Sequence, residues 1–242
     1  MSTYVLVHGA WRGSWIWKRV RRQLQERGHD VFTPTNTGVA DRSHMSSPSV
    51  NLETHIADVA NLLRWEELSN VILCGHSYGG CVISGVADRV PERIGALVYL
   101  DAFVLENGEC LNDKIPQDVR RERIAQAQEV GGGWQLPPIP AEEFNVNLND
   151  RDWVNRQSTM QSLATFEQPL RLTGAINQIK NVSYILATGY SATPFPQFYE
   201  KAKARNWKTI TIECGHDVML DRPEELTQLL LAVSPKNAAS AD

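Results

Sequence analysis

Ser77 stands in a glycine-rich stretch whose spacing is typical of a serine with an activated hydroxyl group. Residues 75–79 read Gly-His-Ser-Tyr-Gly, directly after the apolar run Val71 to Cys74 and directly before a helical pattern that begins near Tyr78. A serine on such a strand-to-helix turn exposes its Oγ, and the flanking positions must be glycine because a Cβ would collide with the neighbouring strand or helix. The pattern predicts a nucleophilic serine, with an ordinary glycine-rich turn as the alternative.

His216 is the histidine best placed to remove the proton from this serine. A serine hydroxyl is a poor nucleophile until a general base acts on it, and that base can come from another loop at the same edge of a sheet. Of the six histidines, His216 alone follows the last predicted strand, and it stands after Ser77 in the chain, which is the order that accompanies this kind of turn. The other five fall in turns, in loops or on a helix, where a solvated or core role is expected.

The acidic partner of the histidine has several candidates. Residues 187–194, which follow the penultimate predicted strand, contain no carboxylate. Asp101 ends the strand beside the one that leads to the serine, so its end lies between the serine and histidine loops, and we predict that it is the acid. Asp217 is an alternative, although neighbours on a tight turn usually point apart, and Glu213 or no acid at all also stay open. Asp101 could instead only form a turn at the end of its strand.

The end of the first predicted strand could stabilise negative charge on a substrate. Residues 8–11 read His-Gly-Ala-Trp, a pattern that supplies one half of an oxyanion hole. Acyl transfer places negative charge on a carbonyl oxygen, and two fixed backbone N–H groups must meet it. We predict that Ala10 and Tyr78 supply them, with a plain tight turn as the alternative. Arg12, beside this turn, is expected to be solvated, or else to bind a substrate carboxylate.

Aromatic residues in loops could line an apolar binding pocket near these groups. Such a pocket would suit the aromatic acyl or alcohol part of a substrate. Each ring could equally belong to the core, so their pattern alone does not decide between the two roles. We predict that substrate is bound by Trp11, Phe103, Trp134 and Trp153.

The elements that position these residues alternate between short apolar runs and longer amphipathic segments. This alternation predicts a parallel sheet with helices on both faces. Strands are predicted at Tyr4 to Val7, Asp30 to Pro34, Asn70 to Cys74, Ala96 to Asp101, Val182 to Thr188 and Lys208 to Glu213. Helices are predicted at Ser14 to Arg27, Leu52 to Glu67, Tyr78 to Arg89, Pro196 to Arg205 and Pro223 to Val233.

This alternation breaks once, after the fourth strand. Residues 103–179 show no strand pattern but do show helical patterns at Asp118 to Glu129 and Asp152 to Phe166. A structureless loop of that length is uncommon in a compact domain, so the segment is predicted to be a helical cap. The core is then formed by residues 1–102 and 180–236, and residues 237–242 are expected to be a flexible tail.

Composition restricts the kind of ligand. The net charge of −4 and the pI near 5.9 predict no nucleic-acid or membrane partner and favour a small molecule. No signal peptide or membrane span is recognisable, which predicts a cytoplasmic protein. The four cysteines form no C-x-x-C pair, and no residue cluster has the spacing of metal ligands, so neither a metal nor a cofactor is expected. The sequence leaves a monomer and a homodimer equally open.

With these residues laid out, the chain resembles bacterial α/β-hydrolases related to plant methyl esterases and hydroxynitrile lyases. The resemblance extends over nearly the whole chain and rests on residues 5–11, 33–34 and 41–44, the serine turn, residues 98–103 and residues 215–216. It implies the α/β-hydrolase fold, with a six-stranded, mostly parallel sheet and a helical cap after the fourth strand. Bacterial relatives whose strand ends in Tyr-Leu-Asp-Ala-Phe include hydrolases of small xenobiotic esters and carbamates.

Two positions depart from the family patterns. The plant esterases have their acid after the penultimate strand, where this chain has Gly189-Tyr190-Ser191, so that role passes to Asp101. Hydroxynitrile lyases have a lysine just after the histidine and a threonine in place of Gly9, whereas this chain has Asp217 at the first position. The resemblance therefore implies a serine esterase or carbamate hydrolase that acts through a Ser-His-Asp triad on a substrate with an aromatic or apolar group. A receptor without turnover and a lyase are the alternatives.

Overall fold

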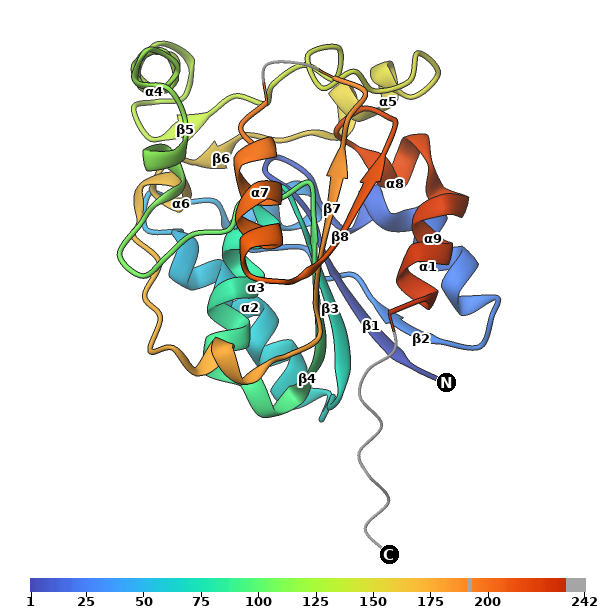
Figure 1. The fold of residues 1–242 in the computed structure, drawn as a ribbon. Helices are drawn as coiled ribbons and strands as arrows, with labels where there is room; N and C mark the ends of the chain where they lie inside the picture. Colours follow the sequence, from blue (N-terminus) through green and yellow to red (C-terminus); the bar gives the residue numbers. More distant parts are fainter. Residues whose placement is uncertain (191–192, 234–242) are drawn as a thin grey trace, which may run out of the picture.

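Six parallel strands form the central sheet of the molecule. The computed structural model describes residues 1–190 and 193–233. The strands lie in the order β2-β1-β3-β4-β7-β8 (Figure 1), and every pair of neighbours is parallel. Their bounds are β1 (Thr3–Val7), β2 (Asp30–Phe32), β3 (Val71–His76), β4 (Ile94–Leu100), β7 (Val182–Ala187) and β8 (Lys208–Ile212). All six predicted strands are confirmed, with boundaries within two residues of those expected.

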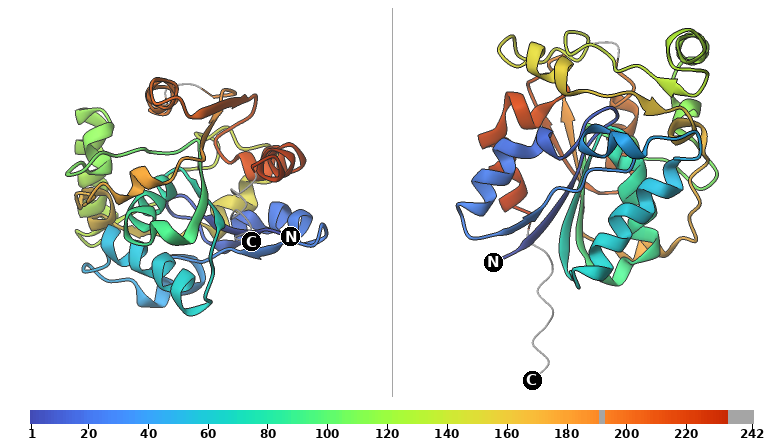
Figure 2. Two further views of the ribbon diagram at one scale, coloured as in Figure 1. Left: turned by 60° about the horizontal axis from the view of Figure 1, so that its bottom comes forward. Right: turned by 180° about the vertical axis from the view of Figure 1, so that it is seen from behind.

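Helices cover both faces of the sheet, as the alternating pattern predicts (Figure 2). One face is covered by α1 (Lys18–Gln25), α8 (Val218–Asp221) and α9 (Pro223–Leu231), and the other by α2 (Leu52–Trp65), α3 (Gly79–Arg89) and α7 (Pro196–Ala204). Short 3₁₀ turns are η1 (Ser14–Trp17), η2 (Ala40–Met45), η3 (Pro91–Arg93), η4 (Leu111–Lys114) and η5 (Ala175–Gln178). The helix α8, which begins two residues after His216, was not predicted, because four residues are too few to show a helical period.

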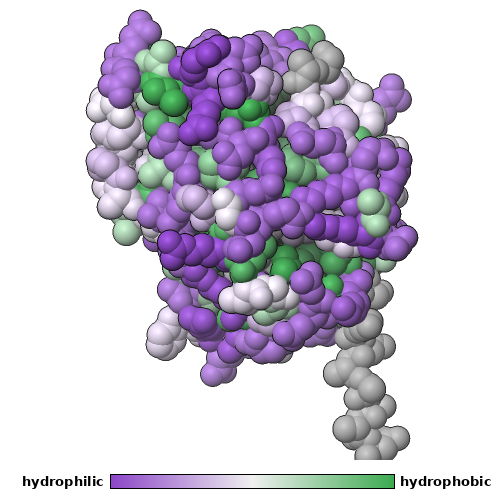
Figure 3. Space-filling view, turned by 60° about the vertical axis from the view of Figure 1, so that its left-hand side comes forward, coloured by the Kyte–Doolittle hydropathy of each residue, from purple (hydrophilic) through white to green (hydrophobic). Residues whose placement is uncertain are grey.

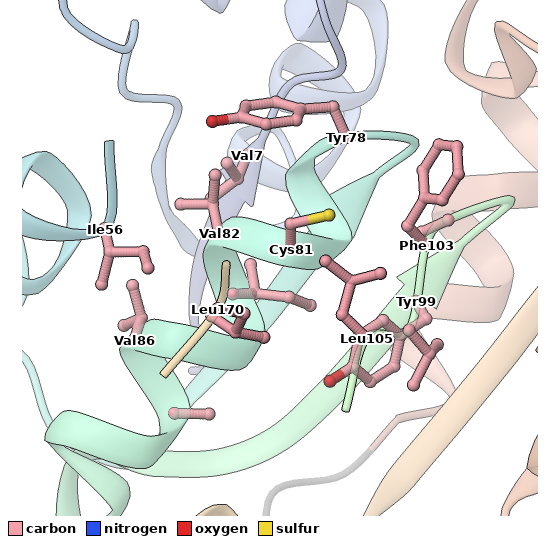
Figure 4. Close-up of a cluster of buried hydrophobic side chains, with 14 of the residues drawn as sticks. Val7, Ile56, Tyr78, Cys81, Val82, Val86, Tyr99, Phe103, Leu105 and Leu170 are labelled. Atoms are coloured by element: carbon pink, nitrogen blue, oxygen red, sulfur yellow. The ribbon is translucent and has the colours of Figure 1, made fainter. Parts of the chain in front are cut away.

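Alternation of side chains along each strand divides the core into two clusters. In β1, Val5 and Val7 face the α2 and α3 side, whereas Tyr4 and Leu6 face the α1 and α9 side. All are buried, as expected when both faces of a strand are covered. Figure 4 shows how Cys81, Val82 and Val86 of α3 fill the first cluster together with Ile56 of α2.

The close packing of α3 leads directly to the loop that carries the serine. At Gly85, an added Cβ would lie 2.3 Å from Cδ1 of Ile56, so α2 and α3 pack closely here and a larger residue would displace the Ile56 side chain. The other helix is fixed at its start: Asn51 accepts a hydrogen bond from the N–H of Thr54 and the Thr54 hydroxyl accepts one from the N–H of Asn51, an arrangement that stabilises a helix N-terminus. The position of the α3 N-terminus is therefore well determined.

The segment inserted between β4 and β7 contains α4 (Gln117–Val130), β5 (Gln135–Leu136), α5 (Arg151–Gln157), β6 (Gln161–Ser162) and α6 (Ala164–Glu167). Its first predicted helix is confirmed. The second, predicted at Asp152 to Phe166, is confirmed only in part: α5 covers its start and α6 its end, but β6 interrupts it and pairs antiparallel with β5. Two-residue strands are too short for periodicity to reveal. Gln161 of β6 is buried, and its side chain accepts a hydrogen bond from the N–H of Trp11 in the loop after β1.

The inserted segment lies over the edge of the sheet towards which the strands point (Figures 1 and 2). The predicted tail, residues 237–242, lies outside the described residues. Among the residues described, no helix is long and apolar enough to cross a membrane. The face that includes α4 is mainly hydrophilic, and hydrophobic residues show there in small separate areas (Figure 3).

Candidate active site

Ser77 stands on a tight turn between β3 and α3 with a backbone conformation that side chains rarely adopt. Its φ is 54°, in the left-handed region, and its carbonyl accepts a hydrogen bond from the N–H of Phe103 at 3.1 Å. Glycines surround it out of necessity: a Cβ at position 75 would lie 2.5 Å from the Gly79 oxygen, and one at position 80 would lie 2.2 Å from the Phe103 oxygen. Strain of this kind costs about 1 to 3 kcal/mol and is concentrated at functional sites.

Asp101 and His216 form a buried hydrogen-bonded pair at the same edge of the sheet. Nδ1 of His216 lies 2.7 Å from Oδ2 of Asp101, and since a carboxylate only accepts, the imidazole donates. The other carboxylate oxygen, Oδ1, accepts from the N–H of Ala187 at 3.1 Å. Asp101 directly follows β4 and Ala187 ends the neighbouring β7, so the pairing of these strands holds the carboxylate. The fold therefore brings Ser77, Asp101 and His216 to one edge.

Tyr190 is a further member of this group that sequence reasoning missed. It stands in the segment where the methyl esterases carry their acid, and its hydroxyl donates a hydrogen bond to Oδ2 of Asp101. The hydroxyl also lies 3.0 Å from Nδ1 of His216. Burial, followed by the charge of Asp101, raises the pKa of Tyr190 far above its ordinary value, so it stays a donor. The absence of a carboxylate after β7 gave no sign that a tyrosine would contact Asp101.

Ala10 and Tyr78, whose backbone N–H groups are the predicted oxyanion donors, line the same cavity as Ser77 and His216. Within the described part of the chain, no protein acceptor is bound to either N–H, and Tyr78 stands at the N-terminus of α3, where the helix dipole favours negative charge. The turn after Ala10 is held by hydrogen bonds to the inserted segment. The N–H of Trp11 donates to Oε1 of Gln161 at 2.8 Å, and its indole Nε1 donates to the Leu136 carbonyl at 3.2 Å. The inserted segment thus fixes the position of this turn.

Ser77 and His216 open onto one cavity of about 770 Å³ between the sheet edge and the inserted segment. Both also border a second space of about 10 Å³, roughly the size needed for one water molecule, so they are close neighbours. The cavity is lined mainly by apolar and aromatic residues. They include Ala10, Trp11, Tyr78, Phe103, Leu111, Ile115, Val119, Ile139, Phe144, Phe166 and Phe195.

Two of the four predicted substrate-binding residues line this cavity and two do not. Trp11 and Phe103 are part of its wall. Trp153 is partly buried and packs edge-on against Trp15 at 4.9 Å between ring centroids, against the core cluster on the α1 side. The Trp134 ring lies against its own turn, where a Cβ at position 132 would be 3.6 Å from Nε1. Trp134 and Trp153 therefore do not line this cavity, and both rings make local packing contacts instead.

The aromatic residues that contact the histidine were not predicted. Phe195 stacks on His216 with ring centroids 5.0 Å apart and an interplanar angle of 11°. Phe144 lies 4.8 Å from the same ring, and its carbonyl accepts the His216 N–H at 2.9 Å. Neither phenylalanine stands near a motif, so no sequence signal distinguishes them from other rings.

Arg12 is buried and ion-paired, which corrects the expectation that it is solvated. Its Nη2 lies 3.2 Å from Oδ2 of Asp217, and both side chains are at most 2% exposed; its Nη1 donates to Ser158 at 2.6 Å. Burial alone would raise the pKa of Asp217, but the charge of Arg12 holds it below the usual value. Asp217 is therefore engaged with Arg12 and makes no hydrogen bond to the His216 ring.

Three buried neutral histidines near the site make the fold sensitive to acid. Burial lowers the pKa of His8 and His55 to about 4 and that of His76 to about 3, from 6.5 in the unfolded chain. At a pH between the folded and unfolded pKa values, the unfolded chain binds more protons than the folded protein. The contribution of these histidines to the free energy of unfolding is therefore fully present above pH 6.5 and is lost as the pH falls towards 4. We expect the free energy of unfolding to fall by about 1.4 kcal/mol per pH unit for each histidine.

Urea unfolding followed by circular dichroism, at pH values from about 7.5 down to about 5, measures this slope. The variant His55→Asn should remove about a third of it, because one of three similar groups is lost. A free energy of unfolding that stays constant over this range in the native protein would contradict the expectation.

Comparison with known proteins places the chain in a family. The model of the alpha/beta hydrolase family matches residues 4–229. The chain is 46% identical over 243 residues to a carbendazim hydrolyzing esterase from Nocardioides sp. (strain SG-4G), covering 96% of this chain and 100% of that protein. It is 30% identical over 176 residues to putative methylesterase 13, chloroplastic, from Arabidopsis thaliana, covering 69% of this chain and 38% of that protein.

A solved structure has the same fold. The extracellular alpha/beta-hydrolase from a Paenibacillus species, described as sharing homology with tobacco salicylic acid binding protein 2, matches with a TM-score of 0.83. The two are 23% identical, and the match covers 97% of this chain and 99% of that chain. Together with the parallel sheet and the family match, this likeness confirms the predicted α/β-hydrolase fold. The chain belongs to the alpha/beta hydrolase family.

Proposed function

We propose that this protein is a serine esterase that cleaves a small carboxylic ester or carbamate ester through an acyl-enzyme on Ser77. One observation carries the proposal: the strained Ser77, the His216 that is hydrogen-bonded to Asp101, and Ala10 and Tyr78 with their free N–H groups all line a single cavity. The 46% identity to an esterase over nearly the whole chain supports the same reaction. No step needs a metal or cofactor, since each proton and charge is handled by a residue of the chain.

The first half of the reaction forms the acyl-enzyme. His216, held by its Nδ1–H on Asp101, takes the Ser77 proton on Nε2 while Oγ attacks the acyl or carbamoyl carbon. The N–H groups of Ala10 and Tyr78 receive the oxyanion, and each such donor is worth about 3 to 4 kcal/mol in known hydrolases. His216 then gives its proton to the leaving alcohol, which departs as the carbonyl re-forms.

The second half of the reaction regenerates the serine. His216 removes a proton from water, and the resulting hydroxide attacks the acyl carbon. The tetrahedral intermediate is held by the same two N–H groups, and it collapses as His216 returns the proton to Oγ. The acid product, or a carbamic acid from a carbamate ester, then leaves the cavity.

The shape and lining of the cavity support an aromatic or apolar group on the substrate. Rings of Trp11, Phe103, Phe166 and Phe195 line it, and apolar walls with a few polar groups are typical of small-molecule sites. We further propose that residues 103–179 act as a cap, because α4 and α6 supply wall residues and close one side of the cavity. The four cysteines are buried free thiols, which supports the proposed cytoplasmic location.

A panel of aryl, alkyl, lactone and carbamate esters tests the proposal, together with labelling by a fluorophosphonate. We expect repeated turnover on at least one aryl or carbamate ester, and we expect the label on the peptide that contains Ser77. Labelling at another residue would refute the assignment of the nucleophile. Tight binding of esters without release of alcohol would favour a receptor instead.

Release of cyanide from a cyanohydrin would favour a lyase. Two residues of the site argue against this activity. Lyases of this fold need a threonine at position 9, and a Cβ there would lie 2.9 Å from Nδ1 of His76 and 3.0 Å from the Ser77 Cβ. The lysine that they carry after the histidine is replaced here by Asp217, which is paired with Arg12.

A further inference from the structure

Arg123 brings a positive charge to the wall of the cavity that contains Ser77 and His216. It stands on α4 in the inserted segment and is part of the cavity lining. The carbon Cζ of its guanidinium lies 6.0 Å from the ring centroid of Trp11 and 5.9 Å from that of Phe166. These rings hold the guanidinium beside the turn that carries Ala10, at a distance at which cation–π attraction is effective.

This guanidinium has no acidic partner in the described part of the chain. It forms no ion pair there, and its Nη1 is buried without a hydrogen-bond partner. The described lining residues include two carboxylates, Asp113 and Glu143, but Asp113 accepts a hydrogen bond from the N–H of Cys110 at 2.8 Å, and Glu143 is exposed to solvent. Arg12 differs in this respect, because its buried charge is paired with Asp217.

Leaving a half-buried cation unmatched has a free-energy cost that an anionic ligand would remove. Burial lowers the pKa of Arg123, which reflects this cost, but a guanidinium stays charged at neutral pH. Its planar set of N–H donors fits the two oxygens of a carboxylate, and charge-assisted bonds of this kind are stronger than neutral ones. The neighbouring rings of Trp11 and Phe166 shield one side of the guanidinium from water, which strengthens the attraction further.

We propose that Arg123 is a specificity residue that binds a carboxylate on the ester substrate, away from the scissile bond. This inference rests on the proposed esterase activity and deepens it: the substrate class becomes esters that are also carboxylate anions. The anionic part would extend towards Trp11 and Phe166, while the scissile carbonyl lies at Ser77. Arg123 takes no part in the bond-breaking steps, so its effect falls mainly on KM.

Two matched substrates test this assignment. The first is 4-nitrophenyl hydrogen glutarate, which carries a free carboxylate, and the second is its neutral methyl ester. For Arg123→Gln, we expect kcat/KM to fall by about 10- to 100-fold on the anionic substrate, chiefly through KM, and by less than about 3-fold on the neutral one. Arg121→Gln removes the same charge from an exposed position of α4 and should leave both values unchanged.

An equal loss on both substrates would show that Arg123 only supports packing of α4, and no loss on either would show that it does not meet the substrate. Binding to Ser77→Ala provides a second measurement that needs no turnover. By calorimetry, monomethyl glutarate should bind that variant about 10-fold or more tightly than dimethyl glutarate, and adding Arg123→Gln should abolish the difference. If this difference is absent while esters are turned over, the inference about Arg123 fails alone. If it is present while no ester is turned over, the esterase proposal fails alone.

Discussion

Replacing Ser77 by alanine is expected to lower kcat for ester hydrolysis by about a million-fold, as when a hydrolase loses its nucleophile. The acyl-enzyme cannot form without Oγ, and the oxyanion donors alone leave only a small residual rate. Initial rates on a 4-nitrophenyl ester, with stopped-flow detection of any burst, measure the loss. Substrate binding should persist, because the cavity wall is otherwise intact.

Ser84→Ala is the matched control for this variant. Ser84 lies on the same helix, and its hydroxyl is bonded to the Gly80 carbonyl and to the Tyr99 hydroxyl, both at 2.8 Å, so its loss should reduce stability while kcat stays within a few-fold. Ser77→Gly guards against a folding artefact, because glycine relieves the φ of 54° at this position and should be equally inactive. Activity of Ser77→Ala within about 100-fold of the native enzyme would exclude an obligatory role for Ser77.

The sheet and the residues at its edge follow from short-range patterns. Six apolar runs alternate with amphipathic helices, and parallel strands place the residues that follow them at one edge. Ser77 after β3, Asp101 after β4 and His216 after β8 were therefore predicted to lie together, and they do. The glycines around the serine also follow from local sterics, since position 75 admits no Cβ.

The remainder of the site depends on contacts between residues far apart in the chain. The pairing of Arg12 with Asp217 spans 205 positions, and the bond from Trp11 to Gln161 spans 150. No periodicity in the sequence encodes such contacts, so a charged residue in a loop, such as Arg12, is predicted to be solvated. Aromatic residues pose the same problem in the inserted segment: residue type does not distinguish Trp153 from a pocket residue, yet it packs against Trp15 at the border of the core.

Asp101→Asn is the second substitution with a large expected effect, and the geometry specifies how it acts. Oδ1 accepts from the Ala187 N–H at 3.1 Å, and Oδ2 accepts from Nδ1 of His216 at 2.7 Å. The asparagine oxygen would keep the bond to Ala187, so its NH₂ group would face His216 and Tyr190. An NH₂ donor there requires an unprotonated Nδ1, which moves the proton to Nε2, the nitrogen that must accept from Ser77. We expect kcat to fall by about 10⁴-fold.

The comparison with Asp217→Asn decides between the two candidate acids. Asp217 is next to His216 in the chain and just as buried, but its carboxylate pairs with Arg12. Removing one partner of a buried ion pair costs about 3 to 5 kcal/mol of stability, so this variant should unfold at a lower urea concentration while its folded fraction keeps kcat within about 10-fold of the native value. Rates normalised to active sites titrated with fluorophosphonate separate the two effects, because stability changes the number of sites and not their turnover. The opposite ranking, with Asp217→Asn slower per site than Asp101→Asn, would transfer the role of the acid to Asp217.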